Sequence, residues 1–131
     1  FGQALQSLLQ SRCGPGASPK VLYISDAIIG NGCDAGKAYQ AVVSKLAELG
    51  VTRVARAELR QTTPEALAHL LQGVDCVYCD MGNTYYLRYH MRRSGFDHLV
   101  PPLVRDAGLV YVGVSAGGMC AGRTISVAFW K

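Results

Sequence analysis

Several features that mark other protein classes are missing from this sequence. No apolar run is long enough to cross a bilayer and no secretory signal is present, so neither a membrane-embedded nor an exported protein is expected. The five cysteines form no small-domain disulfide pattern, which predicts reduced thiols and a cytoplasmic location. The net charge is only +4 and the basic residues form no stripe, so no nucleic-acid partner is expected.

The chain also lacks internal repeats, linkers and low-complexity segments, and it begins at Phe1 rather than at a methionine, as a fragment or a processed form would. Its 131 residues suffice for one domain with a core but not for two. Half of the residues are hydrophobic and 17% are charged, a balance typical of a globular protein.

Short apolar runs alternate with helical patterns along the chain. Strands are predicted at residues 20–27, 51–59, 74–80 and 109–114, with a fifth at 124–130. A glycine-rich loop is predicted at 28–36, and helices at about 34–49, 62–73 and 82–95, at 101–108 after a proline break, and just after residue 115. This alternation predicts an α/β fold with a mostly parallel sheet and helices on both faces.

Small polar clusters follow three of the predicted strands. They are Ser25-Asp26, the run from Asp80 to Asn83, and Ser115. Because open α/β sheets bind ligands beyond the carboxyl ends of their strands, we expect a site where these clusters meet.

The run from Gly113 to Gly117 matches G-x-S-x-G, the pattern of a nucleophile elbow, with Ser115 at its centre. The bare pattern should occur by chance in roughly one chain in ten, but here it follows a predicted strand and precedes a predicted helix. The amide of Ala116 would be one donor to a developing oxyanion. The alternative is a small-residue turn that only lets the helix pack on the sheet.

The second cluster could supply the other oxyanion donor. Gly82 gives a backbone that can approach a ligand closely, and Asn83 can hold the loop through its side chain. Thr84 is predicted to cap the helix that follows. The alternative is a capped turn with no chemical role.

A nucleophilic serine needs a base, but the three histidines all precede it in the sequence. We expect His69, His90 and His98 to be surface or core-edge residues. No histidine, aspartate or glutamate follows Ser115.

Other chemistry-bearing residues favour structural roles. Cys76 and Cys79 lie within a predicted strand and should point to opposite faces as buried thiols, not as a metal or redox pair. Cys120 is expected to be a packing residue. The tyrosines of the 82–95 helix are expected to face the sheet, with some able to line a pocket.

The segments "DMGNTYYLRYHMRRSGFDHLV" and "LVYVGVSAGGMCAG" together resemble the aspartyl dipeptidase and cyanophycinase family of serine peptidases. That family has a G-G-N-T-like turn before a helix, then a strand leading into G-x-S-A-G. The resemblance covers residues 20–131 and implies a class I glutamine amidotransferase-like, flavodoxin-like sandwich. It also implies hydrolysis of short peptides with an N-terminal aspartate, without metal or cofactor.

Carried over by position, the resemblance implies that Ser115 is the nucleophile and that Gly82 and Ala116 supply oxyanion-hole amides. It implies site-shaping roles for Asn83, Gly113 and Gly117.

The chain departs from the family pattern in two ways. Met81 replaces the first glycine of the turn, and the histidine and acidic partner that the family carries after the serine have no counterpart before Lys131. We therefore expect an N-terminal extension at 1–19 and a partial peptidase domain at 20–131. Its sheet would end in an open edge that favours a homo-oligomer or a complementing chain. The alternatives are a non-catalytic protein or pseudoenzyme that binds a small acidic ligand, and a different hydrolase of the amidotransferase-like fold.

Overall fold

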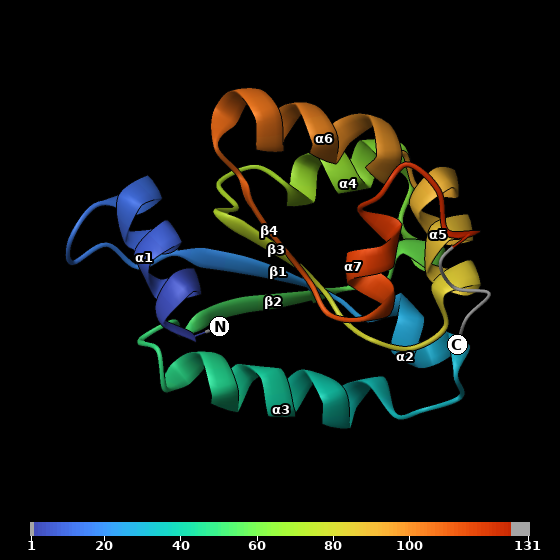
Figure 1. Ribbon diagram of the computed structural model, residues 1–131, viewed down its shortest axis with the longest axis horizontal. Helices are drawn as coiled ribbons and strands as arrows, with labels where there is room; N and C mark the ends of the chain where they lie inside the picture. The colour runs from blue at the N-terminus through green and yellow to red at the C-terminus, as the bar shows by residue number, and fades with distance from the viewer. Residues whose placement is uncertain (1, 127–131) are drawn as a thin grey trace.

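The computed structural model describes residues 2–126, which form a four-stranded parallel sheet between two layers of helices (Figure 1). The strands are β1 (Lys20–Ile24), β2 (Arg53–Ala57), β3 (Cys76–Cys79) and β4 (Val110–Gly113), in the order β2-β1-β3-β4. All three pairings are parallel, which confirms the predicted α/β class.

The helices divide between the two faces of the sheet (Figure 1). One face carries α2 (Asp26–Gly30), the 3-10 turn η1 (Leu59–Gln61), α4 (Pro64–Leu70), α5 (Thr84–Arg93), α6 (Phe96–Ala107) and α7 (Ala116–Cys120). The other face carries α1 (Gly2–Cys13) and α3 (Ala35–Ala47). In residues 2–126 we find no helix with the length and apolar character needed to span a membrane.

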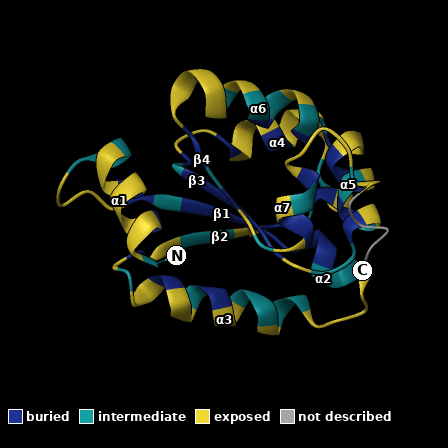
Figure 2. Ribbon diagram, viewed as in Figure 1, coloured by how far each residue is buried: buried dark blue, intermediate teal, exposed yellow. Residues whose placement is uncertain are grey.

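The two central strands are buried on both sides (Figure 2). Leu22 and Ile24 of β1 join the core under α5 and α6, whereas Val21 and Tyr23 join the core under α1 and α3. Successive side chains of a strand point to opposite faces, so a continuous apolar run fits a sheet covered on both sides.

Two helix starts agree with the local sequence signals. The Asp34 carboxylate accepts hydrogen bonds from the amides of Gly36 and Lys37 at the start of α3. The Thr63 hydroxyl accepts from the amide of Ala66, with Pro64 in the first turn of α4.

The prediction for residues 20–36 is partly wrong. The first strand ends at Ile24, and residues 26–30 form α2 where a continued strand and a loop were expected. Gly30 lies so close to α5 that a Cβ there would be 2.7 Å from Cβ of Tyr86. Packing against a distant helix therefore sets this segment, which local sequence signals could not reveal.

The predicted proline break is also absent, because α6 runs through Pro101 and Pro102 without interruption. Each proline lacks an amide hydrogen, so the helix forgoes two backbone hydrogen bonds. Its apolar residues Phe96 and Val100 are buried in the core, and tertiary packing of this kind supplies most helix stability in proteins.

For the predicted fifth strand, residues 124–126 are not in a strand, and 127–130 lie outside the described residues.

Within the predicted extension 1–19, α1 packs onto the sheet. Leu5 and Leu9 are buried in one core, and Arg12 forms a 3.0 Å ion pair with Asp75. The domain boundary at residue 19 stays a prediction.

The neighbours Leu8 and Leu9 test this packing, since Leu8 is 53% exposed and Leu9 only 2%. We expect Leu9→Ala to lower the free energy of unfolding by about 2–4 kcal/mol, because it removes buried methyl groups and leaves a cavity. Leu8→Ala should change it by less than about 0.5 kcal/mol. Urea denaturation measures both, and equal effects would show that α1 is not part of the core.

Candidate functional site

The ends of three parallel strands bring the predicted polar clusters to one edge of the sheet. Ile24 of β1 is in register with Cys79 of β3, which is in register with Gly113 of β4. The residues that follow these three positions therefore leave the sheet side by side. The sheet order also reverses here, because β2 and β3 lie on opposite sides of β1, and such switch points are where open α/β sheets bind ligands.

Ser115 forms the turn between β4 and α7. Its backbone has φ 51° and ψ −103°, and among residues 2–126 it is the only non-glycine residue with a positive φ. Such a conformation costs about 1–3 kcal/mol and persists only where the surroundings enforce it. The Val114 amide donates to the Cys79 carbonyl at 3.0 Å, and the Met119 amide donates to the Ser115 carbonyl at 2.9 Å. The result is an exposed serine on a strained strand-to-helix turn.

Gly113 and Gly117 permit this turn because backbone atoms occupy the space where their side chains would be. A Cβ on Gly113 would lie 2.6 Å from the amide nitrogen of Gly118, and one on Gly117 would overlap the carbonyl group of Cys79. The Tyr111 hydroxyl also donates to the Gly117 carbonyl at 2.7 Å. Gly117 thus lets the start of α7 lie directly against the end of β3, and Gly113 lets it lie directly against the end of β4.

The loop after β3 is fixed in a similar way against α2. Gly82 has φ 137°, and a Cβ there would overlap the carbonyl of Ala27. The same carbonyl accepts a hydrogen bond from the Asn83 amide at 2.9 Å. The side chain of Asn83 caps α5 by accepting from the Tyr86 amide at 3.0 Å. The cap predicted at Thr84 is therefore wrong by one residue, because Thr84 is already the first residue of the helix.

Two contacts join this loop's helix to the serine turn. Cys120 of α7 donates from Sγ to the Thr84 carbonyl at 3.6 Å, and the Thr84 hydroxyl lies 3.8 Å from Sδ of Met119. Ala116 opens α7, so its amide is one of those that have no acceptor within the helix. The two predicted amide donors thus belong to turns that pack onto neighbouring segments.

Asp80 stabilises the start of this loop through hydrogen bonds. Its buried carboxylate accepts a hydrogen bond from the Tyr23 hydroxyl at 2.6 Å and another from the Met81 amide at 2.8 Å. Burial, together with this bond to Asp80, raises the pKa of Tyr23 and keeps the phenol protonated as a donor. The sequence predicted that Asp80 lies at the edge of the sheet, but no local pattern predicted its hydrogen bond with Tyr23 of β1.

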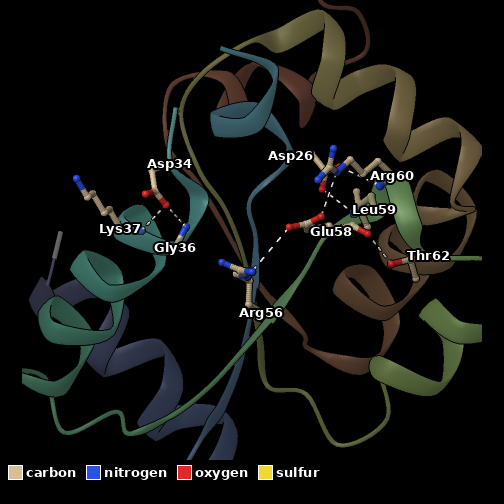
Figure 3. Close-up of polar contacts among 9 residues, drawn as sticks. All are labelled: Asp26, Asp34, Gly36, Lys37, Arg56, Glu58, Leu59, Arg60 and Thr62. Atoms are coloured by element: carbon tan, nitrogen blue, oxygen red, sulfur yellow. Dashed lines mark hydrogen bonds and ion pairs between the residues drawn. The ribbon is translucent and has the colours of Figure 1, made fainter. Parts of the chain in front are cut away.

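Asp26 has a structural role that the sequence did not reveal (Figure 3). Its fully buried carboxylate accepts hydrogen bonds from the amides of Leu59 at 2.7 Å and Arg60 at 2.9 Å. Burial raises the pKa of Asp26, while these two bonds act to lower it. Glu58 pairs with Arg60 at 3.0 Å and with Arg56 at 3.8 Å. Asp26 therefore anchors η1 to the start of α2.

The three histidines lie on α4, α5 and α6, and none belongs to the elements that form the serine turn. His69 on α4 and His98 on α6 are exposed. His90 on α5 is buried and contacts the rings of Tyr86 and Tyr89, whose centroids are 4.6 and 4.9 Å from its own. Within residues 2–126, no side chain forms a hydrogen bond with Oγ of Ser115.

The cysteines have the structural positions that the sequence predicts. Cys76 belongs to the core under α1 and α3, and Cys79 to the core on the opposite face. Burial raises the pKa of Cys76 to about 12 and also raises that of Cys79, so both remain thiols. Cys120 is buried in the same core as Cys79. In the part of the chain that the structure describes, no group of three or more His, Cys, Asp or Glu residues is placed to hold a metal ion.

Comparison with known proteins gives one family. The family model described as peptidase family S51 matches residues 2–129. Among solved structures, the chain resembles the 1.5 Å crystal structure of a protein designated a candidate peptidase E from Listeria monocytogenes EGD-e, with a TM-score of 0.69 and 21% identity. The match covers 92% of this chain but 58% of that one. No curated protein sequence matches.

The contact between Gly117 and Cys79 can be tested with two neighbouring glycines of α7. Gly117→Ala should lower the free energy of unfolding by about 1–3 kcal/mol, because the new Cβ forces α7 away from β3. Gly118→Ala should be neutral or stabilise by up to about 1 kcal/mol, because its Cβ would make only ordinary contacts in a helix. Chemical denaturation compares them, and equal stabilities would contradict the tight packing of the turn.

Burial, the largest effect, lowers the pKa of His90 below the value of 6.5 for an exposed imidazole, and Arg93 and Arg60 act in the same direction. The nearby charge of Asp26 opposes this shift. The unfolded chain then binds a proton more readily than the folded one, so stability should fall as the pH drops through about 6.5.

We expect His90→Gln to lose less stability between pH 7 and pH 5 than the wild type does. His69→Gln, at an exposed position, should behave like the wild type. Urea midpoints at several pH values measure this, and the hypothesis fails if the two variants have the same pH dependence.

Proposed function

The chain belongs to peptidase family S51, and we propose that it carries the nucleophile of a serine peptidase of the aspartyl dipeptidase type. The substrates would be short peptides with an N-terminal aspartate. The observation that carries this proposal is Ser115 itself, an exposed residue with a strained backbone at the carboxyl edge of the sheet, where open α/β sheets bind ligands.

In the proposed reaction, Oγ of Ser115 attacks the carbonyl carbon of the scissile peptide bond and its proton passes to a base. The carbonyl oxygen becomes an oxyanion, for which the amides of Gly82 and Ala116 are the proposed donors. The carbon–nitrogen bond then breaks, the amine leaves with a proton, and water hydrolyses the acyl-serine. Asn83, Gly113 and Gly117 would keep the two turns in place.

None of the three histidines is assigned as the base, because two are exposed on other helices and the third contacts two tyrosine rings. The chain spans 58% of the length of the structure that it matches. Peptidase activity of a complete enzyme is therefore proposed for this chain and not shown. Loss of the base in a serine enzyme costs several orders of magnitude in rate. Activity of this chain therefore depends on whether a base activates Ser115.

Fluorophosphonate labelling, read by peptide mass spectrometry, measures whether Ser115 is activated. We expect one label on the peptide that contains Ser115 when a base of this chain or of a second copy takes the Oγ proton, because such probes report a serine that a base activates. Ser115→Ala should remove the label.

Ser126 offers a matched control, since it is another serine in the described part of the chain and its hydroxyl is within 2.8 Å of that of Thr124. Ser126→Ala should leave the labelling unchanged. A folded sample that takes up no label would contradict catalysis by this chain and favour binding of a small acidic ligand at the same edge.

A further inference from the structure

A groove outside the serine turn lies between α5 and the segment that follows α7, which run side by side (Figure 1). Its volume is about 350 Å³. The residues that line it are Arg88, Tyr89, Arg92, Arg123, Thr124 and Ile125. The proposed catalytic residues are not among them, so this groove is a separate surface.

The groove is positively charged. Three of its lining residues are arginines and none is acidic. Arg88 is already paired with Asp97 at 2.6 Å. Arg92 and Arg123 are exposed and form no ion pair within residues 2–126. Two guanidinium groups are thus available, and each can bind a carboxylate through two parallel hydrogen bonds.

The groove also offers an aromatic surface. The sequence predicted that the tyrosines of α5 face the sheet, but Leu87 and Met91 do so, and Tyr89 is 56% exposed. Arg93 lies over the ring of Tyr89, 5.9 Å from its centroid, and does not line the groove.

An apolar cavity of about 390 Å³ adjoins the groove, and Arg88 lines both. Its apolar wall includes Phe96, Val100, Pro101 and Val104 of α6. Val104 is 37% exposed at this wall, so an apolar group from outside can reach it.

We propose that this combined surface binds an acidic peptide segment that carries one large apolar side chain. The apolar side chain fills the cavity beside α6, and neighbouring carboxylates pair with Arg92 and Arg123. A nucleic acid fits less well, because its phosphate backbone offers nothing apolar for the cavity and the chain has a net charge of only +4. The pairing of an apolar anchor with a charged rim is the usual arrangement of peptide and protein interfaces.

The test is fluorescence anisotropy with the full chain and a labelled hexapeptide that contains five glutamates and one phenylalanine. We expect saturable binding that weakens as salt is added. Replacing the glutamates by glutamine, or the phenylalanine by alanine, should each weaken binding about tenfold or more. This readout does not require a reactive serine, so the groove and the proposed peptidase activity can fail separately.

A charge-matched pair of variants separates the groove from the overall charge. Arg92→Gln with Arg123→Gln should weaken binding about tenfold or more, because both carboxylate partners are lost. Lys37→Gln with Arg53→Gln removes the same charge from exposed positions outside the groove and should change binding less than twofold. Val104→Asp should also weaken binding by placing a like charge at the cavity.

Three results would overturn the proposal. One is equal loss of binding in the two double variants, which would show that only net charge matters. Another is equal binding of the glutamate and glutamine peptides. The last is a sedimentation experiment in which the wild type is a dimer and Val104→Asp a monomer, which would assign the surface to a second copy of the chain.

Discussion

The close approach of α7 to the end of β3 is the constraint on which the serine turn depends. Gly117 lies against the carbonyl of Cys79, and that same carbonyl accepts the hydrogen bond from Val114. With Val114 before Ser115 and Gly117 two residues after it both held against β3, the serine has little freedom to relax from its positive φ. Packing of backbone on backbone, more than any side-chain interaction, therefore keeps the hydroxyl exposed at the edge of the sheet.

The loop after β3 depends in turn on α2. The carbonyl of Ala27 receives the amide of Asn83 and lies against Gly82, so α2 determines where this loop runs. Asp26 fixes the start of α2 by binding the amides of η1. The buried carboxylate of Asp26 binds backbone amides and, through α2, helps to fix the loop that follows β3.

The sequence sufficed for features set by local chemistry. The helix that starts near Asp34, the parallel α/β class and the strand-to-helix turn around Ser115 all follow from side-chain type and spacing. The sequence did not predict the helix α2, because the residues that stabilise it lie on η1 and α5, far away in the chain. The uninterrupted α6 and the exposed Tyr89 were missed for a related reason, since packing against the rest of the molecule outweighed proline and aromatic preferences.

The register of the sheet has a consequence for folding. The candidate site forms where the ends of β1, β3 and β4 meet. These three strands come from separate parts of the chain. Pairings between distant strands form late, because the entropy of closing long loops must be overcome first. Partly folded forms that contain individual helices would therefore lack the site altogether. The serine turn should appear only with the cooperative formation of the whole sheet, which couples any activity at Ser115 to the global stability of the domain.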